Sequence, residues 1–125
     1  MARIYIAGPI AGRALQEYTT AFRYAGACLT ELGWEPVCPL DVEPHQHDGD
    51  CPPGPAAGET EPGAPTHTAP CYMRSDLGAL LTCDAIYLLD GWEYSSGART
   101  EFEVARAAGL AIHYQWYETT LGGAS

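Results

Sequence analysis

Lysine is missing from this sequence, and six arginines face sixteen aspartates and glutamates. Without lysine the chain cannot form a Schiff base, attach pyridoxal phosphate or supply the lysine of a Walker A loop. The net charge of −10 repels the phosphate backbone of nucleic acids and anionic lipid surfaces, so we expect neither a nucleic-acid polymer nor a membrane as partner. A small phosphorylated ligand is still allowed, because backbone N–H groups and one arginine can bind it locally.

Long apolar runs are absent as well. No stretch approaches the ~18 residues needed to cross a bilayer, and residues 1–8 lack the apolar core of a secretory signal. The five cysteines are odd in number and scattered along the chain, which favours reduced thiols over a disulfide framework. These features predict a cytoplasmic protein.

The length of 125 residues predicts a single domain, residues 1–125, with one hydrophobic core. A hydrophobic content of 46% excludes overall disorder. One segment differs from the rest, since residues 44–70 hold seven prolines and four glycines and show no apolar periodicity. Such a segment cannot bury enough surface to order itself, so we predict a long mobile loop inserted at about 44–70.

Outside this insert, short β-branched or continuously apolar runs alternate with apolar residues at helical spacing. The pattern predicts, in chain order, a strand at 3–7, a helix at 14–32, an edge strand at 35–38, a helix at 72–82, a strand at 85–89, a helix at 98–108 and a strand at 110–114. This alternation is typical of the α/β class. We predict a doubly wound, flavodoxin- or Rossmann-like open parallel sheet of four or five strands with helices on both faces.

Ligands bind such sheets outside the carboxyl ends of the strands, where the strand order reverses. Two loops, residues 8–13 and 90–97, are expected to meet there. In the first loop, Gly8 and Gly12 lie four apart at the foot of a helix, which lets backbone N–H groups approach a ligand. A plain strand-to-helix turn explains this loop equally well.

The second loop leads into a helix that carries two glutamates with different surroundings. Glu103 lies four residues after Arg99 and three before Arg106, so helical ion pairs explain it. Glu101 has only small or apolar residues at those offsets, which leaves room beside it for a ligand. The helix N-terminus is also expected to keep a carboxylate ionised, as a carboxylate nucleophile requires. Glu101 is therefore our candidate for the working carboxylate.

Asp76, Asp90 and Tyr5 are further candidates near the strand ends. Each also has a structural explanation. Asp76 can be a first-turn helix charge, Asp90 a turn former, and Tyr5 a core aromatic whose hydroxyl needs a partner. Both interpretations stay open at this point.

Histidines and cysteines in the insert form the spacings H-x-H-x-x-x-C and H-x-x-x-C. The residues are His45, His47, Cys51, His67 and Cys71. They are of zinc-ligand type, but the C-x-x-C pairs usual in structural zinc sites are missing and the segment is rich in flexible residues. We therefore predict no metal and no cofactor, and zinc binding by the insert is the alternative.

Several motifs occur together in one order along the chain. They are Arg3-Ile4-Tyr5-Ile6-Ala7-Gly8-Pro9, Arg74-Ser75-Asp76 with Cys83-Asp84-Ala85, Asp90-Gly91-Trp92, and an S-x-G-x-x-x-E element from Ser95 to Glu101. This set resembles the nucleoside 2-deoxyribosyltransferase superfamily over most of the chain outside the insert. The resemblance implies that Glu101 attacks the anomeric carbon of an N-glycoside while Asp76 assists protonation of the departing base. It also implies that Tyr5 orients the nucleophile or sugar, and that Gly8 and Ile10 line the base and sugar pocket.

The residue six before the nucleophile distinguishes two branches of this superfamily. Nucleoside transferases tend to have an acid there, whereas nucleoside 5′-monophosphate N-glycosidases have a serine, and this chain has Ser95. A hydroxyl with the N–H groups of Ser96 and Gly97 at a helix N-terminus suits a phosphate dianion, which an acid would repel.

The chain departs from the superfamily pattern at three places. Ala11 stands where the hydrolase branch often has an arginine, and Arg13 is our candidate to substitute for it. Glu103 stands where a glycine is common, and the insert is longer than the usual connection. Arg13 and Asp90 complete the predicted substrate-binding residues.

The sequence thus predicts an enzyme that hydrolyses the N-glycosidic bond of a (deoxy)nucleoside 5′-monophosphate to free base and sugar 5-phosphate. One alternative is base exchange between nucleosides, as in the transferase branch. Another is a nucleotide-binding module without turnover. The resemblance also implies a homodimer or higher homo-oligomer.

Overall fold

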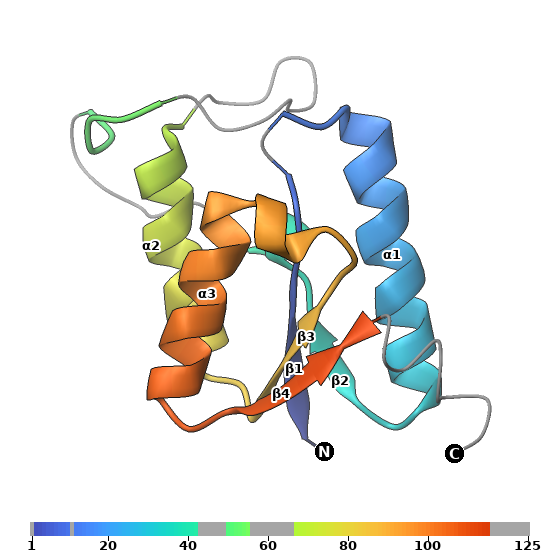
Figure 1. The fold of residues 1–125 in the computed structure, drawn as a ribbon. Helices are drawn as coiled ribbons and strands as arrows, with labels where there is room; N and C mark the ends of the chain where they lie inside the picture. The colour runs from blue at the N-terminus through green and yellow to red at the C-terminus, as the bar shows by residue number, and fades with distance from the viewer. Residues whose placement is uncertain (1, 11, 43–49, 56–66, 116–125) are drawn as a thin grey trace.

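The computed structural model describes residues 2–10, 12–42, 50–55 and 67–115, which form a four-stranded sheet flanked by α-helices (Figure 1). The strands are β1 (Arg3–Ala7), β2 (Glu35–Val37), β3 (Ala85–Leu88) and β4 (Ala111–Tyr114). The helices are α1 (Leu15–Glu31), α2 (Ala69–Leu80) and α3 (Ser96–Ala107), with short 3₁₀ turns η1 (Pro39–Asp41) and η2 (Trp92–Tyr94). The strand order is β2-β1-β3-β4 and every pairing is parallel, which confirms the predicted doubly wound α/β fold.

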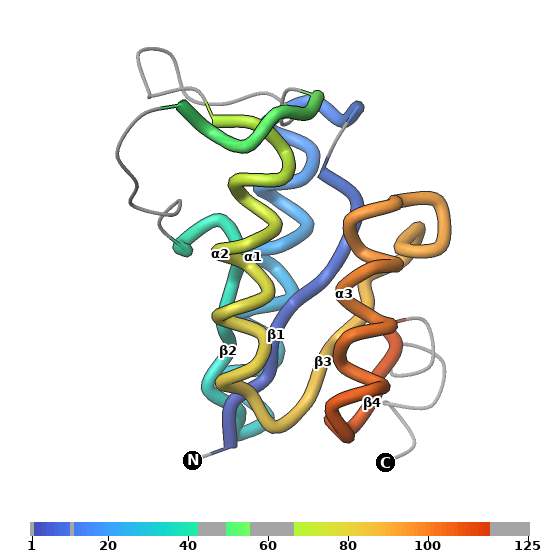
Figure 2. Tube along the Cα trace, turned by 90° about the vertical axis from the view of Figure 1, so that its left-hand side faces the viewer, coloured from blue at the N-terminus to red at the C-terminus, as the bar shows by residue number. Residues whose placement is uncertain are grey.

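Helices cover both faces of the sheet, with α1 on one side and α2 and α3 on the other (Figures 1 and 2). Side chains of β1 alternate between these faces because successive residues of a strand point in opposite directions. Ile4 and Ile6 pack on the α1 side, whereas Tyr5 and Ala7 pack on the side of α2 and α3. All four side chains are buried, which explains why the strand reads as a continuous apolar run.

The start of α2 differs from the prediction. This helix begins at Ala69, inside the segment predicted as a loop at 44–70. Thr68 caps it, because the Thr68 side chain accepts a hydrogen bond from the Cys71 N–H at 3.3 Å. Proline is tolerated in the first turn of a helix, so Pro70 does not prevent this early start.

Part of the insert, residues 50–55, is held against this helix start. The Thr68 hydroxyl donates to the Pro52 carbonyl oxygen at 2.7 Å, and the Ala69 N–H donates to the Pro55 carbonyl oxygen at 2.8 Å. The predicted mobile loop is therefore too long, because groups at the helix start supply partners that a proline-rich segment lacks by itself. The remaining predicted loop residues, 44–49 and 56–66, lie outside the described residues.

The strand order reverses between β1 and β3, since β2 lies beyond β1 and β4 lies beyond β3. The carboxyl ends of these two strands are in contact. The Leu89 N–H donates to the Ala7 carbonyl oxygen at 2.9 Å, and a Cβ at Gly8 would lie only 2.8 Å from Leu89 Cδ1. Close packing of the strand ends therefore explains Gly8, which the resemblance assigned to the ligand pocket.

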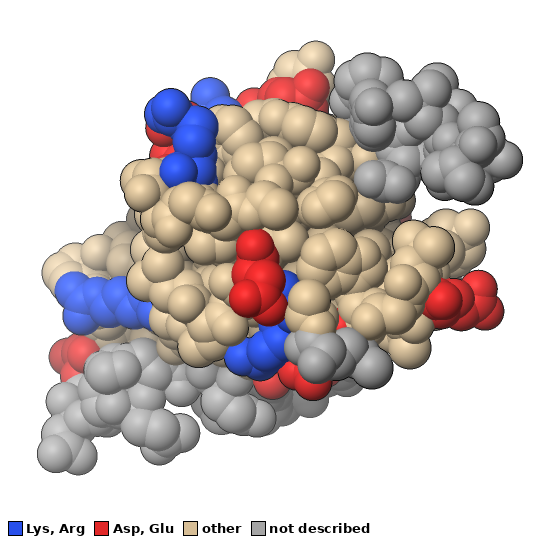
Figure 3. Space-filling view, turned by 90° about the horizontal axis from the view of Figure 1, so that it is seen from below, with Lys and Arg blue, Asp and Glu red and all other residues tan. Residues whose placement is uncertain are grey.

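Figure 3 shows the end of the molecule at which the strands begin. Within the part of the chain that the structure describes, arginine side chains on this end lie in separate places beside acidic ones, and they form no continuous basic patch. Arg3 pairs with Glu35 at 2.8 Å, and Arg106 pairs with Glu103. None of the helices in the described ranges is long and apolar enough to cross a membrane.

The close contact between Gly8 and Leu89 leads to a prediction about the stability of a variant. We expect Gly8→Ala to lower the free energy of unfolding by about 1 to 3 kcal/mol, because the new Cβ overlaps the buried Leu89 side chain. Urea unfolding followed by circular dichroism measures the change.

Gly26→Ala is the matched control. In α1, a Cβ at Gly26 meets only Ile6 Cδ1 at 3.8 Å, an ordinary contact, so this variant should be more stable by up to about 1 kcal/mol. Equal stability of Gly8→Ala and the wild type would contradict the close contact.

Candidate functional site

Tyr5 and Glu101 form a buried hydrogen bond on the α2/α3 side of the sheet. The Tyr5 hydroxyl, from the middle of β1, donates to Glu101 Oε2 at 2.6 Å. Tyr5 is fully buried, and Glu101, at 6% exposed, is the single polar or charged residue in the buried class within the described ranges. Buried acids are rare in folded proteins and concentrate at functional sites, so this pair is the starting point for the site.

Glu101 faces inward because the buried side of α3 repeats at helical spacing. Ala98, Glu101 and Ala105 are the buried residues of this helix, three and four apart. Glu103 lies on the exposed side and pairs with Arg106, as the spacing predicted. The two glutamates therefore lie on different faces of one helix, and only Glu101 reaches the core.

Asp76 lies on α2, the helix that packs beside α3, and its charge acts on both Tyr5 and Glu101. Asp76 Oδ1 and the neighbouring Ser75 Oγ are buried, and neither atom has a hydrogen-bond partner among the described residues. Such atoms are uncommon because each has lost its hydrogen bonds to water. A bound ligand could supply the missing bonds. We refer to Tyr5, Asp76 and Glu101 as the acidic triad.

Burial raises the pKa of both carboxyl groups of the acidic triad. It raises the pKa of Asp76 to about 7. For Glu101, burial and then the Asp76 charge raise the pKa to about 8, while the hydrogen bond from Tyr5 acts in the opposite direction. The prediction that the start of α3 keeps Glu101 ionised is therefore wrong for neutral pH. The helix dipole contributes little compared with the loss of water around a carboxylate.

These groups can exchange protons close to neutral pH. Tyr5 stays protonated, because burial and the two nearby carboxylates raise the pKa of its hydroxyl. Between about pH 7 and 8, Glu101 and Asp76 together carry about one proton. One carboxyl can then act as a nucleophile while the other holds a proton to donate.

The start of α3 holds the three residues predicted to bind phosphate. Ser95 is the N-cap, and its Oγ accepts a hydrogen bond from the Ala98 N–H at 3.2 Å. The Ser95 hydroxyl hydrogen can still donate to a ligand. Ser96 is exposed, and Gly97 faces α2, where Met73 Cε lies 3.5 Å from the place of a Gly97 Cβ. A helix start with free N–H groups and a hydroxyl favours an anion.

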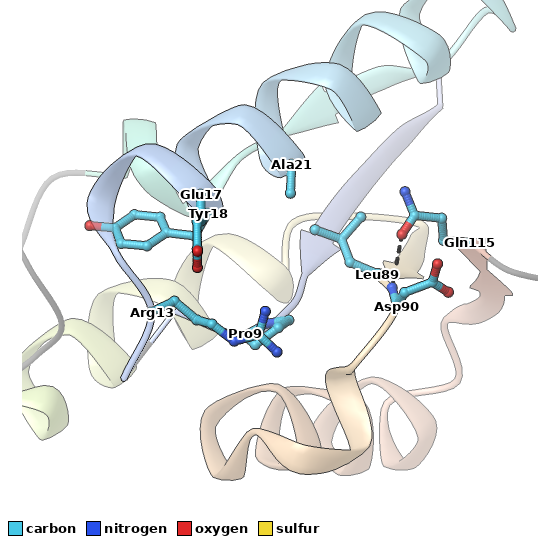
Figure 4. A pocket seen from close by; sticks show the side chains of 8 residues that line it. All are labelled: Pro9, Arg13, Glu17, Tyr18, Ala21, Leu89, Asp90 and Gln115. Atoms are coloured by element: carbon cyan, nitrogen blue, oxygen red, sulfur yellow. Dashed lines mark hydrogen bonds between the residues drawn. The ribbon is translucent and has the colours of Figure 1, made fainter.

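Arg13 and Asp90 follow the carboxyl ends of β1 and β3. They line a hollow of about 150 Å³, drawn in Figure 4. The lining residues are Pro9, Arg13, Glu17, Tyr18, Ala21, Leu89, Asp90 and Gln115. Arg13 and Asp90 lie at different sides of this hollow, and the Asp90 N–H donates to Gln115 Oε1 at 2.8 Å. No member of the acidic triad lines this hollow. The two predicted loops do meet here, since Arg13 Nη2 lies 3.4 Å from the place of a Gly91 Cβ.

Ile10 and Gly8 have packing explanations in the loop after β1. Ile10 packs against the core on the α1 side, and its carbonyl oxygen accepts a hydrogen bond from the Arg13 N–H at 3.1 Å. These contacts form the turn that leads into α1. These contacts agree with a plain strand-to-helix turn, and ligand binding by this loop stays a prediction.

Two residues of interest escaped the sequence prediction. Ser75 belongs to the Arg74-Ser75-Asp76 motif, and its place beside Asp76 is the sequence signal that points to it. Gln115 follows β4, and its contact with Asp90 depends on β4 lying next to β3. The strand order has to be known before this contact can be predicted.

Residues 2–114 of the chain match the protein family described as Domain of unknown function (DUF4406). The chain belongs to the DUF4406 family. The search of curated proteins found no match. The match covers every described element from β1 to β4, so the acidic triad lies inside the DUF4406 domain.

The burial of Glu101 in this DUF4406 domain predicts how the stability of the protein depends on pH. The folded state holds the Glu101 proton up to about pH 8, whereas the unfolded chain releases it near 4.5, so stability falls as the pH rises between these values. Glu101→Gln removes this loss, because an amide stays neutral and its oxygen can still accept from Tyr5. We expect the variant to gain up to about 4 kcal/mol over the wild type between pH 5 and pH 8.5. Thermal unfolding at both pH values measures the gain.

Glu103→Gln is the control for this prediction, since it makes the same change on the exposed face of the same helix. Its stability relative to the wild type should vary little with pH, because exposed ion pairs contribute little. Parallel pH dependence of the Glu101→Gln variant and the wild type would show that Glu101 is not buried as a neutral acid.

Proposed function

We propose that this DUF4406 protein is an N-glycosidase that hydrolyses a nucleoside 5′-monophosphate to free base and sugar 5-phosphate. The observation that carries the proposal is the buried hydrogen bond from Tyr5 to Glu101, with Asp76 close enough for its charge to raise the pKa of Glu101. A carboxylate, an orienting phenol and a second carboxyl in one buried group support the roles implied by the resemblance to the nucleoside 2-deoxyribosyltransferase superfamily.

The reactive form is the one in which the shared proton lies on Asp76 and Glu101 is ionised. In the first step, Glu101 Oε1 then attacks the anomeric carbon of the sugar while the bond from this carbon to the base nitrogen breaks. Glu101 Oε2 accepts the hydrogen bond from Tyr5, which leaves Oε1 to form the new bond. Asp76 donates its proton to the departing base, so that the base leaves neutral. This step yields the free base, a sugar ester of Glu101 and an ionised Asp76.

In the second step, water attacks the same carbon and the ester bond to Glu101 breaks. The ionised Asp76 accepts the proton that the water loses. The products are the sugar 5-phosphate and the Glu101 carboxylate, and the proton is again on Asp76. Because Asp76 acts first as the acid and then as the base, one proton is enough for a full cycle.

The start of α3 supports a phosphorylated substrate. The Ser95 hydroxyl and the N–H groups of Ser96 and Gly97 can donate to phosphate oxygens, and the helix dipole favours the negative charge. Glu101 lies on the same helix, so one element would orient both the phosphate and the nucleophile. Arg13 lines the hollow of Figure 4, which no member of the acidic triad lines, so this proposal gives it no role.

The first test is product analysis with common ribo- and deoxyribonucleoside monophosphates. We expect release of free base and sugar 5-phosphate from at least one of them, measured by chromatography. A second base is added in parallel, and a new nucleoside would instead indicate base exchange. Tight binding in calorimetry with no base released over hours would instead indicate a nucleotide-binding module.

Variants of the acidic triad test the assigned roles. Glu101→Gln should abolish base release, because an amide cannot form the sugar ester. Asp76→Asn should reduce kcat by about 100-fold or more, which is the usual contribution of a general acid. Glu103→Gln, on the same helix but exposed, should keep wild-type activity. Unchanged turnover in Glu101→Gln would exclude the mechanism.

The raised carboxyl pKa values predict the pH dependence of kcat/KM. The productive form carries one proton on the two carboxyls, so activity should rise through about pH 7 and fall above about pH 8. In Asp76→Asn the fall on the alkaline side should disappear, because no acid remains to lose its proton. A flat wild-type profile from pH 5 to 9 would contradict these assignments.

A further inference from the structure

Cys51, His67 and Cys71 form a cluster at the N-terminal end of α2. Cys51 lies in segment 50–55, His67 lies just before the Thr68 cap, and Cys71 lies in the first helical turn. The two sulfur atoms lie 3.2 and 3.4 Å from His67 Nδ1, and the three ligand atoms lie within 4.8 Å of one another. Two segments that are far apart in the sequence therefore bring two thiols and one imidazole to a single point.

The two sulfur-to-nitrogen distances are close to those around a tetrahedral zinc ion. With Zn–S bonds of about 2.3 Å and Zn–N bonds of about 2.0 Å, a sulfur and a nitrogen ligand lie about 3.5 Å apart, and two sulfurs about 3.8 Å. The observed S···N distances of 3.2 and 3.4 Å lie slightly below that value. Two thiolates and a histidine are also the donor set that zinc prefers.

Contacts outside the cluster hold the three residues in place. Thr68 and Ala69 at the helix start bind the backbone of segment 50–55 through the two hydrogen bonds described above. Gly54 lies so close to Pro70 that a Cβ at Gly54 would be 2.5 Å from Pro70 Cγ, which fixes the approach of the segment. The cluster is therefore positioned by backbone contacts and not by the side chains alone.

The surroundings of the ligands restrain their positions. Cys71 is fully buried in the first turn of α2. The His67 ring packs edge-on against Tyr72 with ring centroids 5.6 Å apart, so its orientation is restrained. A Cys51–Cys71 disulfide is the alternative for the two sulfurs, and thiol-to-imidazole hydrogen bonds at these distances would hold His67 Nδ1 beside them.

We propose that Cys51, His67 and Cys71 bind one zinc ion that ties segment 50–55 to the first turn of α2. The two thiols lose their protons to solvent when the ion binds, and the ion takes a fourth ligand beyond these three. Asp76 lies in the next turns of the same helix, so the ion would also steady the helix that carries this carboxyl. The inference does not depend on the proposed glycosidase activity.

Metal analysis of the full chain, purified from zinc-supplemented medium without chelators, tests the proposal. We expect about one zinc per chain, and we expect cobalt to replace it with thiolate-to-metal charge-transfer absorption. Cys51→Ser and His67→Gln should each weaken zinc binding by more than about tenfold, since even outer-shell changes at zinc sites have effects of this size. Cys51 is only partly buried, so its variant should fold, which circular dichroism checks.

Cys28→Ser is the matched control, because Cys28 lies on α1 outside the cluster, and it should keep the full zinc content. Wild-type protein without zinc that also shows no cobalt charge-transfer absorption would overturn the proposal. A chain mass lower by two hydrogens, with Cys51 and Cys71 in one disulfide-linked peptide, would overturn it in favour of a redox pair. Equal zinc affinity of Cys51→Ser, His67→Gln and the wild type would also overturn it.

Discussion

The hydrogen bond from Tyr5 to Glu101 joins the central strand of the sheet to the helix that follows β3. Both side chains lie in the core, so this bond forms only when β1 and α3 have packed against each other. Burying a carboxyl group is unfavourable, and a single phenol donor offsets only part of the loss of water. The small residues Ala98 and Ala105 complete the buried face of α3 on which this polar contact lies.

The two sides of the sheet contribute differently to the molecule. The α1 side is apolar, with Ile4, Ile6 and Phe22 among its buried residues. The other side combines apolar packing with the two carboxyl groups of the acidic triad, each of which favours the neutral form in the folded protein. Ionisation of these carboxyls lowers the stability of the folded state, and apolar burial on both sides of the sheet must offset this loss. Functional sites often reduce stability in this way.

Helix α2 connects the acidic triad to the insert. Its middle carries Asp76, and its first turn carries Cys71 beside Cys51 and His67. The position of Asp76 relative to Glu101 depends on how α2 packs on the sheet, and contacts with segment 50–55 restrain the end of this helix. A proline-rich insert can therefore influence the site through the helix that it contacts, without supplying a residue to the acidic triad.

The order of strands and helices was determined by the sequence alone, because apolar runs and helical spacing are local patterns. The difference between Glu101 and Glu103 was also predictable, since it depends on neighbours within one helical turn. The pKa of Glu101, the placement of Arg13 in a hollow that the acidic triad does not line and the meeting of Cys51 with Cys71 were decided only by the tertiary structure. Each of these features arises where separate segments of the chain exclude water from a group or bring groups together. A local sequence pattern does not contain this information.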